Sequence, residues 1–99
     1  MDGIVILSWT DFEGDDREIY LRHAAGLMDA SAQEPGCLRH VVAADPCSPT
    51  AVIAHAHYVD AEALELHVKG EPFEQFLAAT RDCRVRAKNA NRFEVKKIS

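Results

Sequence analysis

The chain alternates between strand-like and helix-like patterns of apolar residues. Residues 3–9 alternate with a period of two and predict a first strand. The two faces of this strand carry different apolar side chains: Ile4 and Ile6 on one, and Val5, Leu7 and Trp9 on the other. From residue 15 to about residue 32, apolar side chains recur at helical spacing, and acidic residues near the start favour the helix dipole. Pro35 and Gly36 end this helix and turn the chain.

The second half of the chain predicts a hairpin, a broken helix and a last strand. Residues 37–44 and 50–59 predict two strands, and the proline-containing turn between them predicts a hairpin. Asp60 suits the N-cap of a helix over residues 61–68, which Gly70 ends. A further helix is predicted from Glu71 to about Arg81, with Pro72 in its first turn. Residues 85–95 predict a final strand that is less regular around residues 89–91.

These elements predict an α+β protein with the order β-α-β-β-α-β, the second helix being broken in two. This is the ferredoxin-like split βαβ arrangement with a four-stranded antiparallel sheet. Helices cover one face of such a sheet, and the other face, carrying Ile4 and Ile6 or their counterparts, cannot stay in water. We therefore expect a homodimer with a two-fold contact. The length of 99 residues fits a single domain over residues 1–99.

Composition narrows the class of partner. Hydrophobic residues make up 47% and charged residues 27% of the chain, which is ordinary for a soluble globular protein. A net charge of −5 argues against a nucleic-acid partner. The sequence has no apolar run long enough to span a membrane and no features of a signal peptide, so we expect a cytoplasmic protein without a membrane partner. The odd count of three cysteines predicts free thiols.

Several short motifs lie within this pattern. They are Glu34-Pro35-Gly36-Cys37-Leu38-Arg39-His40, Tyr58-Val59-Asp60, Ala63-Leu64 followed by His67, and Pro72-Phe73 followed by Phe76. Their spacing, from about Ile4 to Val95, resembles the antibiotic biosynthesis monooxygenase (ABM) family. The resemblance implies a ferredoxin-like fold that pairs into a dimeric α+β barrel, and it says more about the fold than about the reaction.

The same resemblance implies a reaction class. Members of the family include monooxygenases that oxidise anthrones or quinols without flavin, haem or metal. A deprotonated, electron-rich phenol can pass an electron to O2 itself, so the protein needs to bind the ring, remove a proton and exclude water. No Gly-x-Gly-x-x-Gly motif for a flavin or nicotinamide occurs. The resemblance thus implies oxidation of an anthrone- or hydroquinone-like molecule with no cofactor.

Other functions remain open at this point. A barrel of this kind can bind a small aromatic ligand without catalysis, serve as an accessory protein, or carry out cyclisation or isomerisation. Relatives that degrade haem use a Trp, a His and an Asn at positions that hold Tyr58, Leu77 and Leu7 or Ser8 here, so haem degradation matches poorly.

Two histidines are the candidate catalytic residues. His67 lies one helical turn from Ala63 and Leu64, so we expect it to point inward or to a cavity rim. It either ties its helix to a strand carbonyl or acts as a general acid or base near neutral pH. His40 is the second candidate, although relatives often carry an aromatic residue there and its imidazole can simply fill the same slot.

The candidate substrate-binding residues are aromatic or small. Ala54 and Ala56 share one face of the third strand with Tyr58, which falls where the family usually has Trp. Relatives often carry Glu at position 56 and a large residue at 54, so volume is left behind the two alanines: either the helices fill it or a pocket opens. The expected lining is Trp9, Tyr58, Ala54, Ala56, Phe73 and Leu77.

His55 and His57 are two residues apart on a strand and therefore point to the same face. A metal would need a third ligand from a neighbouring strand or from Cys37, and no residue at a recognised spacing supplies one. We therefore predict no metal site and read the pair as a polar patch on the dimer-facing side of the sheet.

Overall fold

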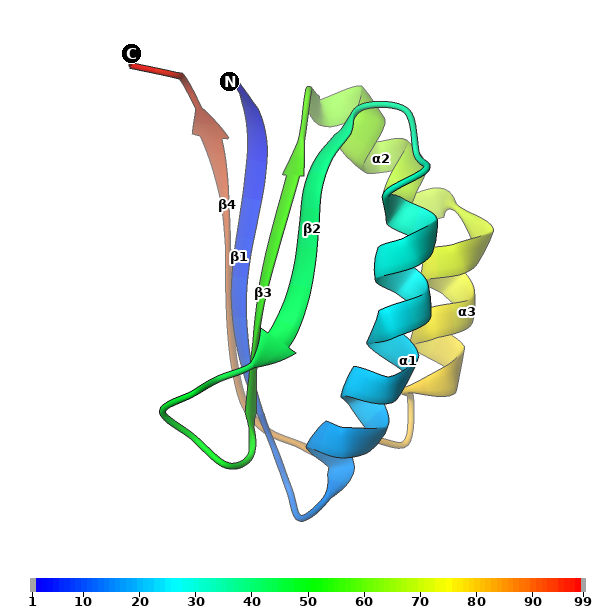
Figure 1. Cartoon of the computed structure of the whole chain (residues 1–99), viewed down its shortest axis with the longest axis vertical. Coiled ribbons are helices and arrows are strands. Elements are labelled where there is room, and N and C mark those ends of the chain that lie inside the picture. Colours follow the sequence, from blue (N-terminus) through cyan, green and yellow to red (C-terminus); the bar gives the residue numbers. More distant parts are fainter. Residues whose placement is uncertain (1, 99) are drawn as a thin grey trace.

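The computed structural model describes residues 2–98 and has the expected order of elements (Figure 1). They are β1 (Gly3–Phe12), α1 (Asp16–Ser31), β2 (Cys37–Ala44), β3 (Ala51–Tyr58), α2 (Ala61–Lys69), α3 (Glu71–Ala79) and β4 (Val85–Val95). The strands form one antiparallel sheet with the order β2-β3-β1-β4, and the three helices lie on one of its faces. The predicted ferredoxin-like fold, the β2–β3 hairpin and the broken second helix are confirmed.

The ends of the elements follow from side-chain burial and capping. β1 runs three residues further than predicted because Thr10 and Phe12 continue its inward-facing alternation and are 8% and 1% exposed. β4 is continuous through residues 89–91, which pair with Leu7, Ser8 and Trp9 of β1. The predicted N-cap of α2 is confirmed, since the Asp60 carboxylate accepts the Ala63 N–H at 2.8 Å.

Alternation along β1 decides which side chains face the helices. Ile4 is buried with Tyr58 beneath α2, and Ile6 packs against the same cluster. The helix-free face therefore carries the alternate residues of β1, Val5, Leu7 and Trp9, rather than Ile4 and Ile6. Leu7 and Trp9 are 45% and 36% exposed there. Ile53 of β3 and Phe93 of β4 are also exposed on this face, beside Trp9 and Val5 in the strand register. This side of the sheet thus exposes several large apolar side chains that no helix of residues 2–98 covers.

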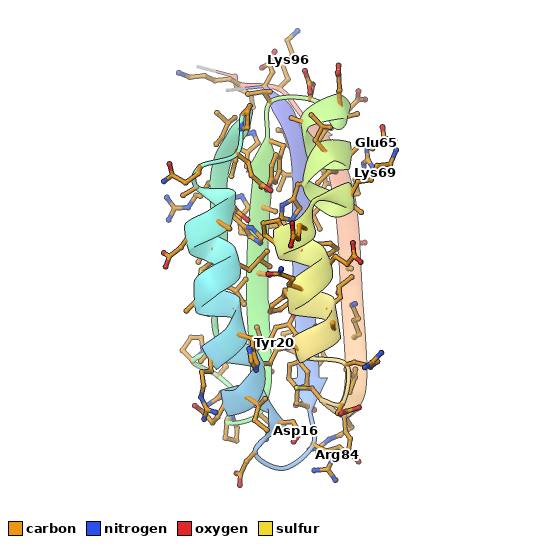
Figure 2. All side chains as sticks on the ribbon, turned by 90° about the vertical axis from the view of Figure 1, so that its right-hand side faces the viewer. Asp16, Tyr20, Glu65, Lys69, Arg84 and Lys96 are labelled. Carbon is orange, nitrogen blue, oxygen red and sulfur yellow. The ribbon has the colours of Figure 1, made fainter. Side chains whose placement is uncertain are left out.

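The buried core between sheet and helices has two parts. The first consists of Phe12, Ala24, Leu27, Val42, Val52 and Phe76, and the second of Ile4, Tyr58, Ala63 and Leu64. Tyr20 packs between the rings of Phe12 and Phe76, at centroid distances of 4.7 and 5.1 Å, in the lower part of Figure 2. On β3 the two parts meet at Ala54 and Ala56, which are half-buried. A band of small side chains therefore separates the two halves of the core.

An ion pair ties α1 to the segment before β4 at one end of the molecule (Figure 2). The Asp16 carboxylate accepts the backbone N–H of Arg84 at 2.8 Å and its Nε–H at 3.0 Å. These bonds hold the pKa of Asp16 below its ordinary value. They fix the end of the helical layer at which α1 begins.

Candidate functional site

One carboxylate joins three elements inside the protein. Glu34 lies in the turn between α1 and β2, and its Oε1 accepts the hydroxyl hydrogen of Tyr58 from β3 at 2.8 Å. The same oxygen lies 2.8 Å from Nδ1 of His67 on α2. Tyr58 is 0% exposed, His67 5% and the Glu34 side chain 20%. A largely buried acid is therefore held by two buried partners, as buried polar groups require.

Gly36 explains why this turn comes so close to α2. Its φ of +83° lies in the left-handed region, and a Cβ there would stand 2.6 Å from the Cβ of Ala63. The carbonyl of Gly36 accepts the backbone N–H of Val59 at 2.8 Å, which fixes the turn against the end of β3. The glycine thus allows the contact that places Glu34 beside His67.

Three rings from three other elements surround the His67 ring. The His67 ring centroid lies 5.2 Å from that of His40 on β2, 5.1 Å from Tyr58 on β3 and 5.0 Å from Phe73 on α3. The two imidazoles meet edge to face, with planes 84° apart. On the far side of this ring cluster, Nδ1 of His40 lies 2.9 Å from the hydroxyl of Ser31, which is fully buried at the end of α1. We call these residues, with Glu34, the histidine cluster.

The surroundings give the titratable groups different roles. Burial lowers the pKa of His40 to about 4, helped by the neighbouring His67, so His40 is neutral at ordinary pH. Burial and the hydrogen bond to Glu34 raise the pKa of Tyr58 above its usual range, so its hydroxyl stays protonated and donates. A carboxylate oxygen accepts hydrogen bonds, so we assign the Nδ1–H tautomer to His67, which leaves Nε2 as its proton-accepting nitrogen. Carboxylate behind imidazole is the usual arrangement of an oriented base.

The structure brings together four of the residues that the sequence singled out. His67, His40, Tyr58 and Phe73 form the ring cluster, and Ala56 lies beside His40 in the β2–β3 register. The rings therefore occupy the space next to this small residue. Ala54 lies two positions further along the same face and packs against the first half of the core.

Two of the predicted substrate-binding residues lie apart from this cluster. Trp9 is on the helix-free face of the sheet, where its Nε1–H donates to the Asp45 carboxylate at 3.0 Å and ties β1 to the β2–β3 turn. Leu77 is 52% exposed, because α3 turns Phe76 inward and leaves Leu77 outside. Within one chain, neither shares a surface with Tyr58.

Glu34 and Ser31 were not among the predicted site residues. Glu34 stands directly before Pro35-Gly36, where a carboxylate is ordinarily an exposed turn residue, so the sequence gives no signal that it points inward. Ser31 follows buried Leu27 by four positions, which places a polar hydroxyl on the inner stripe of α1. The roles of Glu34 and Ser31 depend on the elements that pack against them, which the sequence alone does not give.

Measurable depressions lie on the surface of the molecule. One of about 340 Å³ on the helix-free face is bordered by Leu7, Trp9, Asn89 and Asn91. Another, of about 430 Å³, is a groove between α1 and α3. The ring cluster itself is packed, as the exposures of Tyr58 and His67 show.

The second histidine pair lies on the helix-free face of the sheet. The rings of His55 and His57 stack at a centroid distance of 6.4 Å on the helix-free face, and Nε2 of His57 is buried without a partner. Among residues 2–98, no group of three or more His, Cys, Asp or Glu side chains is placed to hold a metal ion.

The three cysteines are free thiols. Over the same residues, no helix has the length and apolar character needed to cross a bilayer.

Comparison with known proteins identifies the family. The family model described as antibiotic biosynthesis monooxygenase matches residues 4–79, which include the whole histidine cluster. Curated protein sequences give no significant match.

Solved structures confirm the fold. A candidate antibiotic biosynthesis monooxygenase from Deinococcus radiodurans superposes with a TM-score of 0.85 at 17% identity, over 97% of this chain and 95% of that one. A mutant of SnoaB, a cofactor-independent oxygenase from Streptomyces nogalater, gives a TM-score of 0.77 at 17% identity, over 95% and 93%. A conserved protein from Methanosarcina mazei gives 0.84 at 15% identity, over 94% and 92%. At such identities the likeness concerns the fold.

Proposed function

The chain belongs to the antibiotic biosynthesis monooxygenase family, and we propose that it catalyses the cofactor-independent oxidation of an electron-rich aromatic molecule, such as an anthrone or hydroquinone, by O2. The observation that carries this proposal is the Glu34–His67 pair, with 2.8 Å between carboxylate and imidazole inside a cluster of rings. This is the equipment that the first step of such a reaction needs, since an aromatic hydroxyl must lose its proton before it can reduce O2.

His67 is the proposed base. Its Nε2 takes the proton from the substrate hydroxyl while Nδ1–H remains bonded to Glu34, so the imidazolium that forms stands against a carboxylate. In a largely buried site this charge pair is worth more than in water, which supports proton transfer from a weakly acidic phenol. His40 stays neutral because of its lowered pKa, so it offers a hydrogen-bonding nitrogen without competing for the proton.

The remaining chemistry belongs to the substrate and O2. For an anthrone in its phenolic form, the deprotonated ring gives one electron to O2, and the resulting radical pair joins at the ring carbon to form a peroxide. The His67 imidazolium returns its proton to the peroxide. His67 then removes the hydrogen of the same carbon as the O–O bond breaks, and the departing hydroxide takes that proton as water. One oxygen atom enters the new carbonyl and the other becomes water, so O2 takes up the four electrons that the substrate loses.

The same proposal includes a homodimer. Leu7, Trp9, Ile53 and Phe93 expose apolar area on the helix-free face, and single chains rarely leave such a patch open to water. Two copies packed face to face would bury it with an isologous contact. The helices lie on the other face of the sheet and take no part in that contact (Figure 1).

Oxygen uptake tests the function directly. Wild-type protein in metal-free and flavin-free buffer is mixed with a panel of anthrones and hydroquinones, and O2 consumption is followed. Loss of a positioned base costs roughly 100-fold or more, so His67→Ala and, to a smaller extent, Glu34→Gln should slow uptake. Glu65→Gln on the exposed side of α2 is the matched control and should retain the wild-type rate.

Two results would contradict the proposal. Equal rates in wild type and His67→Ala would remove the base from the mechanism. Saturable binding of these aromatics with no uptake in wild type would favour the non-catalytic alternative, which the packed state of the ring cluster also suits.

A further inference from the structure

A groove runs between α1 and α3 on the outer side of the helical layer. Figure 2 shows the two helices side by side in front of the sheet. The groove has a volume of about 430 Å³, and its floor is made by Leu27 of α1 and Phe76 of α3, which are 5% and 7% exposed. Polar side chains are few and stand apart: His23 on α1 and Gln75 on α3. A mostly apolar hollow of this size with one or two polar groups is typical of a small-molecule site.

Gly26 keeps this groove wide. It lies in the interior of α1, where a glycine weakens a helix relative to alanine. A Cβ at this position would meet no atom within 4 Å, so close packing does not require the glycine. Its φ is also not in the left-handed region, so the backbone does not require it either. The absence of a side chain at Gly26 leaves open space on the wall of the groove.

The groove and the histidine cluster are bordered by neighbouring residues of the same two helices. Ala30 borders the groove, and the next residue, Ser31, bonds to His40. Pro72 borders the groove, and the next residue, Phe73, contacts the His67 ring. On each helix, therefore, one residue borders the groove and the next residue contacts one of the two candidate catalytic histidines. The floor formed by Leu27 and Phe76 belongs to the first half of the core, next to the band of small side chains on β3.

We propose that this groove is the docking site from which the aromatic substrate passes between α1 and α3 to His67. The inference rests on the proposed function for the identity of the substrate, a flat and largely uncharged ring system. The ring of Phe76 offers such a molecule an aromatic contact, and His23 and Gln75 can bond to its hydroxyl or carbonyl oxygens at the rim.

The test uses a substitution that fills the groove without disturbing the core. Gly26→Leu places a side chain in the open space, and Ala25→Leu adds the same side chain at the neighbouring exposed position outside the groove. Binding is measured with a water-soluble anthraquinone sulfonate, which is already oxidised and therefore reports on docking without turnover. Backbone amide shifts of the protein locate the bound probe. Oxygen uptake with an anthrone then gives kcat and KM for each variant.

We expect Gly26→Leu to weaken anthraquinone binding and raise KM at least 10-fold with little change in kcat, and Ala25→Leu to match wild type. In wild type, the probe should shift the amides of residues 23–30 and 72–79. If wild type binds the probe there but consumes no oxygen, the docking site stands and the proposed function fails. If uptake is normal and Gly26→Leu leaves KM unchanged, the docking site fails and the function stands. Absence of probe binding to wild type also overturns the docking site.

Discussion

Removal of the Glu34 carboxylate should destabilise the protein more than any exposed substitution of similar size. In Glu34→Ala, the Tyr58 hydroxyl and Nδ1 of His67 both lose the single oxygen that they share. Tyr58 is fully buried and His67 nearly so, so water does not readily replace the lost acceptor. The perturbation therefore leaves two buried polar groups without partners rather than one surface charge fewer.

The structure sets the size of the effect. A buried donor left without an acceptor costs about 1–3 kcal/mol, so two such donors cost roughly 2–6 kcal/mol. The Glu34 side chain is itself 20% exposed, and water entering its place will satisfy part of this demand, so we expect a loss near the lower half of that range, about 3 kcal/mol. Glu34→Gln keeps an acceptor oxygen and loses only the charge, so its cost should be about 1 kcal/mol.

Urea denaturation at one fixed protein concentration measures these values, because dimerisation would otherwise shift the apparent stability. A loss of about 3 kcal/mol corresponds to a fall in Tm of roughly 12–24 °C for a domain of this size. Asp29→Ala, at an exposed position of α1, is the control and should change stability by less than about 0.5 kcal/mol. Equal losses in Glu34→Ala and Asp29→Ala would refute the reasoning that the carboxylate holds two buried groups.

Three further predictions concern other parts of the chain. The pKa of His40 is about 4 in the folded protein against 6.5 in the unfolded chain, so the unfolded state binds more protons between these values. Because the ring is only partly buried, solvent reduces the effect, and stability should fall by about 1–3 kcal/mol as pH drops from 6.5 to 4. Urea titrations should show this part of the loss in wild type but not in His40→Phe. Gly26→Ala should raise the free energy of unfolding by about 1 kcal/mol, since the added methyl meets no atom; a decrease in urea denaturation would contradict the open wall. Leu7→Arg should convert the proposed dimer to a monomer in analytical ultracentrifugation, and a wild-type protein that sediments as a monomer would exclude the dimer.

The fold was predictable because local and global signals agree along most of this chain. Two-residue alternation marks the strands, the acidic N-cap Asp60 begins α2, and Gly70 ends it. The extension of β1 to Phe12 was missed because polar Asp11 hides the continuing alternation. Two residues distant in the sequence hold the partly buried Asp11 carboxylate in the strand. The Thr50 hydroxyl donates a hydrogen bond to it, and the Arg86 guanidinium forms an ion pair with it.

The candidate site was predictable only in part. His67 and His40 were each singled out as candidates from their places on a helix and a strand, and the structure brings their rings to 5.2 Å. The carboxylate that gives His67 its role was not expected, because Glu34 reaches His67 across 33 positions through the conformation of Gly36. Trp9 was expected to line the same pocket as Tyr58, but the pairing of β1 with β3 places the two side chains on opposite faces of the sheet.

The central claim is that Glu34 and His67 supply the base for oxidation by O2 without a resident cofactor. The most direct measurement is turnover of an anthrone under isotopically labelled O2, with protein freed of metals and flavins and with wild type and His67→Ala compared. Wild type should form a quinone that carries one labelled oxygen atom, and His67→Ala should form it at least about 100-fold more slowly. Unlabelled product, or labelled product formed equally fast by both proteins, would contradict it.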